Sequence, residues 1–231
     1  KPKIIVFEKS FHGRSIATIS ASANPLIKKG FEPLLDGFIR IPLNKIEKFN
    51  ELSKSQQEIS AVFLETIQGE GGINIPQEKY LLALREICTK NNWLLILDEV
   101  QCGIGRTGKW FAYQWENIKP DVVPLAKGLG SGIPIGAVLT SEPSGKLMGP
   151  GSHGTTFGGN PFAMRAGIET LKIIEEENLM ENAIARGKQI LESLNNAFCK
   201  NKEIVEIRGC GLMIGIELKK PCKEIARIAL E

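Results

Sequence analysis

The sequence predicts an α/β protein with a mostly parallel sheet and helices on both of its faces. Short runs rich in Val, Ile and Leu alternate with helical patterns over the first part of the chain, and strands that alternate with helices form parallel sheets. The composition suits a folded domain, because 42% of the residues are hydrophobic and 24% are charged, as in ordinary globular proteins.

Six runs have the strand pattern, with β-branched or large apolar residues between turn residues. They cover residues 4–7, 38–41, 61–65, 93–97, 122–125 and 135–140. Between the third and fourth runs we expect a helix that starts near Pro76 and has one apolar face. That face consists of Tyr80, Leu81, Leu84 and Ile87.

The pattern changes near residue 161, which divides the chain into a large domain over 1–160 and a second part over 161–231. The second part should hold the helices between domains and the start of a smaller domain. Long helices are predicted first, over 162–176 and 179–200. Two strands follow over 204–208 and 212–218, hinged at Gly209 and Gly211.

Both ends of the sequence suggest an internal piece of a longer protein. A buried strand pattern begins almost at Lys1, and residues 222–231 read as an amphipathic helix without a glycine after it. We therefore expect part of the large domain to precede this chain and most of the smaller domain to follow it.

Charge and cysteine content exclude several classes of protein. The 29 basic and 26 acidic residues give a net charge of +3, so no nucleic-acid or membrane partner is expected. The longest apolar run, 93–97, is too short to cross a bilayer. Five cysteines without a C-x-x-C pair and two histidines argue against a disulfide framework and a metal site. We expect a cytoplasmic protein without a signal peptide.

Three ionisable residues follow predicted strands. Glu65 ends one strand, Asp98 follows the next, and Lys127 lies just after 122–125. Because ligands of open parallel sheets bind beyond the carboxyl ends of the strands, these residues suggest one site. Taken one at a time, each is better explained as a solvated loop residue.

Glycine-rich segments strengthen the case for a site. Residues 69–72 and 127–132 let the backbone approach a ligand closely, and 153–161 combines hydroxyl groups with flexible backbone before a helix. A P-loop ATPase is a rival interpretation, because an apolar run followed by Asp98-Glu99 resembles its Mg²⁺ strand. Its G-x-x-x-x-G-K-[ST] loop does not occur here, and this reading leaves Lys127 unexplained.

Five motifs identify a family resemblance over residues 3–218. They are F-H-G-R at 11–14, E-T-I-Q-G-E-G-G at 65–72, D-E-V-Q-C-G-I-G-R-T-G at 98–108, A-K-G-L-G at 126–130, and T-T at 155–156. In this order and spacing they resemble the class III, pyridoxal-phosphate-dependent ω-aminotransferases. The resemblance implies the fold-type I architecture of transferases that use pyridoxal 5′-phosphate, and a homodimer with shared active sites.

The resemblance implies a catalytic pair and its cofactor contacts. Lys127 would form the Schiff base with the cofactor aldehyde, as an amine in a pocket that disfavours its charge can do. Asp98 would keep the pyridinium nitrogen protonated so that the ring can accept electrons. Phe11 would stack on the ring and Gln101 would reach its phenolic oxygen.

Three further residues belong to the implied cofactor site. Glu99 and Val100 stand between Asp98 and Gln101 in the same motif. Thr156 would bind the cofactor phosphate, in this family from the neighbouring subunit. For Glu99 a structural role is the favoured interpretation.

The resemblance also implies a substrate site. The planar fork of Arg14 suits a carboxylate, and Thr155 would lie beside the substrate. Glu70 resembles the glutamate that gates a second arginine, which receives 2-oxoglutarate and lies outside this chain. Simpler readings stay open: Phe11 as core, Arg14 as surface charge, and Glu65 as a member of a structural ion pair.

Within this family the chain most resembles the enzymes that act on N-acetylornithine. The implied reaction moves the δ-amino group of N-acetylornithine to 2-oxoglutarate, in arginine biosynthesis. Ornithine, succinylornithine and 4-aminobutyrate are the alternative donors. A non-catalytic binding protein on the same fold is opposed by the presence of Lys127, Asp98 and Gln101.

Overall fold

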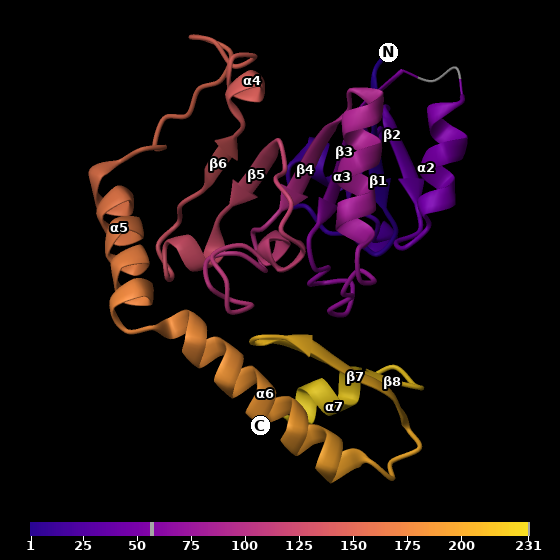
Figure 1. Cartoon of the computed structure of the whole chain (residues 1–231), viewed down its shortest axis with the longest axis vertical. Coiled ribbons are helices and arrows are strands. Elements are labelled where there is room, and N and C mark those ends of the chain that lie inside the picture. The colour runs from indigo at the N-terminus through magenta and orange to yellow at the C-terminus, as the bar shows by residue number, and fades with distance from the viewer. Residues whose placement is uncertain (56–57, 231) are drawn as a thin grey trace.

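The computed structural model describes residues 1–55 and 58–230, and its centre is a six-stranded sheet (Figure 1). The strand order is β2-β1-β3-β4-β5-β6, with the first five strands parallel and β6 antiparallel to β5. The strands are β1 (Lys3–Phe7), β2 (Phe38–Ile41), β3 (Ile59–Glu65), β4 (Leu94–Asp98), β5 (Val122–Leu125) and β6 (Ala137–Thr140). The predicted mostly parallel α/β sheet is confirmed.

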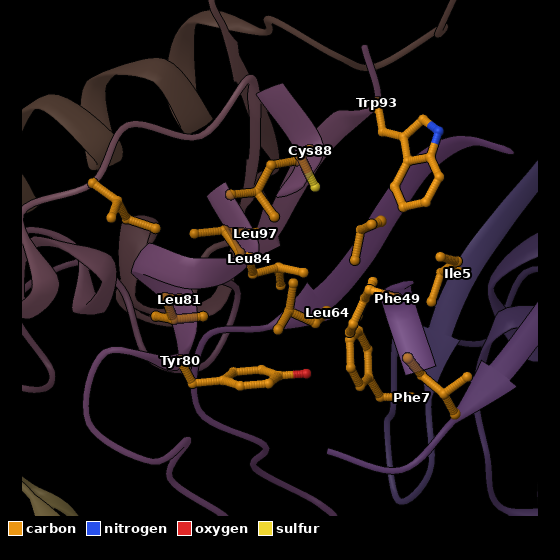
Figure 2. Packing of buried hydrophobic residues seen from close by; sticks show 14 residues of the cluster. Ile5, Phe7, Phe49, Leu64, Tyr80, Leu81, Leu84, Cys88, Trp93 and Leu97 are labelled. Atoms are coloured by element: carbon orange, nitrogen blue, oxygen red, sulfur yellow. The ribbon is translucent and has the colours of Figure 1, made fainter. Parts of the chain in front are cut away.

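The main core lies between the sheet and two helices, α2 (Ile46–Ser53) and α3 (Tyr80–Asn91). Phe7 of β1 packs against Phe49 of α2, with ring centroids 6.1 Å apart, and Leu84 of α3 is fully buried in the same cluster (Figure 2). Each such large apolar side chain contributes roughly 1.5–3 kcal/mol on burial. This packing fixes the central strands, whose ends carry the ionisable residues.

Helix α3 begins later than the sequence pattern predicts. Pro76 lies in the preceding loop, and Lys79 adopts a left-handed conformation with φ of 64° before the helix starts at Tyr80. Asn92, also left-handed, ends the helix, and Trp93 leads into β4. Four predicted residues of the apolar face occur as expected, three buried and one partly buried: Tyr80, Leu81, Leu84 and Ile87.

Shorter helical segments connect the strands. They are α1 (Ile16–Ala21), α4 (Glu142–Gly145) and the 3₁₀ segments η1 (Pro25–Ile27), η2 (Ala112–Glu116) and η3 (Lys127–Leu129). Arg40 of β2 donates through Nη2 to the carbonyls of Ala21 and Ser22, at 2.7 and 2.6 Å. This guanidinium satisfies carbonyl groups at the end of α1 that have no partner within the helix.

After β6 the chain leaves the sheet through two long helices, α5 (Pro161–Glu176) and α6 (Leu179–Phe198) (Figure 1). The Asn160 side chain accepts a 2.9 Å hydrogen bond from the Ala163 amide, and Pro161 occupies the first turn, so α5 has a well-formed start. Leu171 of α5 packs against the cluster at the end of β5. No helix of the described residues is long and apolar enough to cross a membrane.

A two-stranded hairpin follows α6, formed by β7 (Ile204–Cys210) and β8 (Met213–Leu218), and then helix α7 (Lys223–Ile228). The expected hinge at Gly209 is wrong, because Gly209 pairs with Ile214 inside the hairpin. The reversal occurs at Gly211, which has φ of 54°.

The hairpin contacts the large sheet unit backbone to backbone. Leu212 donates its amide to the Arg106 carbonyl at 3.0 Å. A Cβ on Gly211 would lie 2.5 Å from the Thr107 carbonyl carbon, and a Cβ on Gly187 of α6 would lie 2.1 Å from the Gly211 oxygen. Only residues without side chains permit these approaches.

We predict that Gly187→Ala destabilises the full-length protein although alanine is the better helix former. Overpacking costs typically about 1–3 kcal/mol, and a backbone atom at 2.1 Å leaves no flexible group to move away. This loss should exceed the ~1 kcal/mol that Ala gains over Gly in a helix. Urea unfolding should show a lower midpoint.

Gly167→Ala in α5 is the matched control. A Cβ there would lie 3.3 Å from the tip of Ile135, which can shift. We expect its unfolding midpoint to stay level or rise. An equal or higher midpoint for Gly187→Ala would contradict the close packing of α6 on the hairpin.

Candidate active site

The three ionisable strand-end residues meet at one cavity. β3 and β4 pair in register with Glu65 opposite Asp98, and β5, the next strand, leads to Lys127. The cavity has a volume of about 140 Å³. It is lined by Phe11, His12, Gly13, Glu65, Ile67, Asp98, Val100, Gln101 and Lys127. We call it the strand-end cavity.

Asp98 is held in place by two donors. Its Oδ1 accepts a 3.0 Å hydrogen bond from the Val100 amide, and its Oδ2 lies 2.8 Å from Nδ1 of His12. The His12 ring is fully buried and stacks on Phe63 with centroids 3.9 Å apart. This arrangement orients the carboxylate toward the cavity, and His12 serves here as a packing and hydrogen-bonding residue.

Lys127 stands at the start of η3 in a left-handed conformation, with φ of 41°. Such a conformation is uncommon for a residue with a long side chain and is typical of functional sites. The turn that follows is tightly packed, since a Cβ on Gly130 would lie 2.1 Å from the Ile133 oxygen. The surrounding backbone therefore fixes where the lysine side chain starts.

Gln101 reaches the same cavity from the loop after β4. Its Nε2 donates to Oε1 of Glu70 at 3.2 Å. A Cβ on Gly69 would lie only 1.8 Å from the Gln101 side-chain oxygen. The glycine at 69 thus provides the space that the amide of Gln101 occupies.

A second, wider cavity of about 400 Å³ adjoins the first through Phe11, which lines both. Lys9, Arg14 and Glu70 bring charged groups to this cavity. The Arg14 guanidinium carbon lies 5.8 Å from the centre of the Phe11 ring. The sequence-predicted substrate residues Arg14 and Glu70 are therefore neighbours of the predicted cofactor residues.

Glu99 lies outside the strand-end cavity. Its buried carboxylate accepts hydrogen bonds from the Thr66 hydroxyl at 2.7 Å and from the amides of Ala112 and Tyr113 at 2.9 and 3.0 Å. Burial raises the pKa of Glu99, and these hydrogen bonds oppose the rise. Its side chain anchors η2 to the sheet, which matches the structural interpretation of this residue.

Thr155 and Thr156 are exposed and line neither cavity. β6 runs antiparallel to β5, so it carries the chain back to the opposite end of the sheet, where α4 lies (Figure 1). The segment between α4 and α5 then passes along the β6 edge of the sheet, and its residues 157–160 line a separate cavity with residues 133–136. Within one chain, this pair of threonines is separate from the other predicted site residues.

Sequence reasoning placed Glu65 at the site but did not predict its hydrogen-bond partners. Its carboxylate accepts the Phe11 and Gly69 amides, at 2.9 and 3.0 Å, rather than pairing with a charged side chain. Phe11 lies 54 residues away in the sequence. The available signal was that Glu65 ends a strand beside Asp98, but no local pattern reveals a partner so distant.

Comparison with known proteins identifies relatives over the whole chain. The curated acetylornithine aminotransferase of Nitrosomonas europaea is 52% identical over 230 residues, which cover 100% of this chain and 58% of that protein. The acetylornithine aminotransferase of Methanocaldococcus jannaschii is 43% identical over 229 residues, 99% of this chain and 57% of that one. The chain thus spans somewhat more than half the length of these relatives.

Solved structures agree with the sequence relatives. The ornithine aminotransferase of Toxoplasma gondii ME49 superposes with a TM-score of 0.90 at 36% identity, over 94% of this chain and 52% of that one. A Bacillus anthracis aminotransferase gives 0.88 at 31% identity, over 94% and 54%. The family described as aminotransferase class-III matches residues 1–231. This chain belongs to the class III aminotransferases.

Proposed function

We propose that the protein is a pyridoxal-phosphate-dependent aminotransferase that transfers the δ-amino group of N-acetylornithine to 2-oxoglutarate. The observation that carries this proposal is the meeting of Lys127, Asp98, Gln101 and Phe11 at the strand-end cavity. The relatives named acetylornithine aminotransferase, at 43–52% identity, support N-acetylornithine as the donor. The reaction belongs to arginine biosynthesis.

The strand-end cavity suits the ring of this cofactor. Its volume of about 140 Å³ is close to the ~150 Å³ of an engineered cavity that binds benzene. Phe11, Ile67 and Val100 give it apolar walls, while Asp98 and Gln101 supply an acceptor and a donor. A structure of the Toxoplasma gondii relative is described as showing partial occupancy of PLP at its active site.

Asp98 and His12 would act together at the ring nitrogen. When bound, pyridoxal phosphate supplies a protonated ring that takes up the electron pair left as the substrate carbon loses a proton. The Asp98 carboxylate stabilises positive charge on that nitrogen. His12, at 2.8 Å from Oδ2, keeps the carboxylate from rotating away.

Lys127 would hold the cofactor and, when released from it, carry protons. Its amine Nζ can act first as a general base, taking the proton from the δ-carbon of the donor. It can then act as a general acid and deliver that proton to the C4′ carbon of the cofactor. The fixed backbone of η3 keeps this amine at one edge of the cavity. Gln101 would donate to the phenolic oxygen of the ring.

The second cavity would hold the substrates. Arg14 has a planar guanidinium that can bind the α-carboxylate of the donor through two parallel hydrogen bonds. Glu70 lies at the boundary with the strand-end cavity, where it accepts from Gln101. Ornithine is the second candidate donor, because matching solved structures include ornithine aminotransferases at 36% identity.

We further propose a cytoplasmic homodimer whose sites are shared between subunits. Thr155 and Thr156 stand in an exposed segment beside large exposed apolar side chains, among them Phe157 and Phe162, 82% and 71% exposed. In this assembly, residues 1–160 form the large cofactor domain and 161–231 begin the small one. The exposed threonines would then reach the cofactor phosphate of the partner.

A donor panel tests the function. With 2-oxoglutarate as acceptor, we expect the full-length protein to use N-acetylornithine with a higher kcat/KM than ornithine, succinylornithine or 4-aminobutyrate. Borohydride reduction should remove the yellow colour, and peptide mapping should find the pyridoxyl group on Lys127. Lys109→Ala, at a half-buried lysine outside the strand-end cavity, is the control and should still be labelled at Lys127. A preference for ornithine would contradict the named donor, and labelling elsewhere would contradict the site.

Arg14→Lys should lower kcat/KM for N-acetylornithine by roughly 1.5–3 kcal/mol, or about 10- to 150-fold, since lysine keeps the charge but loses the fork. The half-reaction with 2-oxoglutarate should change less, because an arginine outside this chain is expected to serve it. Single-turnover measurements of the two half-reactions provide the comparison. Equal losses in both would show that Arg14 supports the fold or the cofactor instead.

Mixed dimers test the shared site. Lys127→Ala and Thr156→Asp should each inactivate the homodimer, the second because its carboxylate repels phosphate. Co-expression should restore activity, since one site of the mixed dimer collects both lesions and the other collects neither. If Thr156 serves its own chain, both sites remain defective and co-expression restores nothing.

A further inference from the structure

Glu65 connects two loops at the strand-end cavity. It ends β3 and is only 4% exposed. Its Oε2 accepts the Phe11 amide at 2.9 Å, and its Oε1 accepts the Gly69 amide at 3.0 Å. Both oxygens of one buried carboxylate are therefore used by backbone groups from separate parts of the chain.

The two loops carry different parts of the site. The loop after β1 brings Phe11, His12 and Arg14, while the loop of residues 69–72 brings Glu70 and makes room for Gln101. Phe11 and Glu70 both line the wider cavity. The distance between the two loops thus sets the width of the space beside the ring-stacking residue.

We propose that Glu65 is a positioning residue whose ionised carboxylate ties the Phe11 loop to the Gly69 loop and so sets the geometry between cofactor face and substrate cavity. The tie itself rests on observed hydrogen bonds, whereas its effect on turnover rests on the proposed aminotransferase function. Glu65 acts through the two loops rather than by reacting with the substrate.

The tie requires the ionised form. A carboxylate offers two acceptor oxygens, while a protonated carboxyl places an O–H donor on one of them, where it would face an amide N–H. Burial raises the pKa of Glu65 to about 7; the Phe11 and Gly69 hydrogen bonds and His12 oppose the rise, and Asp98 adds to it. Lys127 lines the same cavity. Both loops are therefore held above about pH 7, and one is released below it.

The contribution of Glu65 to the free energy of unfolding changes with pH in the opposite direction to the two loop hydrogen bonds. Because the folded pKa lies above the unfolded value of 4.5, the folded protein binds more protons between pH 4.5 and about 7. Stability contributed by Glu65 is then greatest at the acidic end of this window and falls as the pH rises through it.

Amide exchange in the full-length, cofactor-free protein tests the tie directly. After correction for intrinsic exchange rates, protection of the Phe11 and Gly69 amides in the wild type should increase as the pH passes from below to above 7. In Glu65→Gln, one oxygen is replaced by an NH₂ donor, so protection of at least one amide should fall by about 10-fold or more and lose this pH dependence. Glu65→Asp keeps the charge and should keep the pH dependence with weaker protection.

Glu116→Gln is the matched control. Glu116 also accepts a backbone amide, that of Leu82 at 3.1 Å, and burial raises its pKa, but it lines neither cavity. Its substitution should leave exchange at Phe11 and Gly69 unchanged. Unchanged protection of both amides in Glu65→Gln overturns the proposal, as does a uniform loss of protection over the whole chain, which marks a role in stability alone.

Turnover provides a second readout. Glu65→Gln should lower kcat/KM by roughly 10- to 100-fold, the range for a lost hydrogen bond to a charged group, and should flatten the part of the pH profile near 7. Exchange does not depend on which substrate the protein uses, so failure of the aminotransferase function and failure of the tie give different results. Should Glu65→Gln not fold, the wild-type exchange profile decides: protection independent of pH overturns the proposal.

Discussion

The site depends on two buried carboxylates at the ends of neighbouring parallel strands. In-register pairing of β3 and β4 places Glu65 opposite Asp98, and both are at most 5% exposed. Buried carboxylates require hydrogen-bond donors. Here His12 reaches Asp98 and Phe11 reaches Glu65 from distant segments, while Gly69, four residues after Glu65, donates locally. The loops that form the cavity are thus positioned by their hydrogen bonds to the two acidic residues of the sheet.

Sequence reasoning succeeded where local pattern determines structure. All six strands of the large sheet were predicted with small errors at their ends, because apolar runs between turn residues have few other conformations. Asp98 and Lys127 were placed at one site because parallel strands end at one edge. The start of α3 was misplaced because Pro76 suits a first helical turn, yet the chain makes a left-handed turn at Lys79 before the helix begins.

The features that could not be predicted from the sequence depend on contacts between residues far apart in the chain. Glu99 follows Asp98 directly, but successive residues at the end of a strand point to opposite sides, and Glu99 binds the amides of η2 instead. The left-handed φ of 41° at Lys127 depends on a turn packed from several directions. Both features follow from tertiary structure, for which a single sequence contains no local signal.

The contact among α6, the hairpin turn and the loop at Thr107 consists of stacked backbones, with Gly187 against Gly211 and Gly211 against Thr107. A clash between two side chains can be relieved by shortening the second one, so such positions can change together during evolution. Here neither glycine has an atom that a second substitution could remove. The two positions therefore lack compensating partners, and each must remain glycine independently for the chain to keep this arrangement.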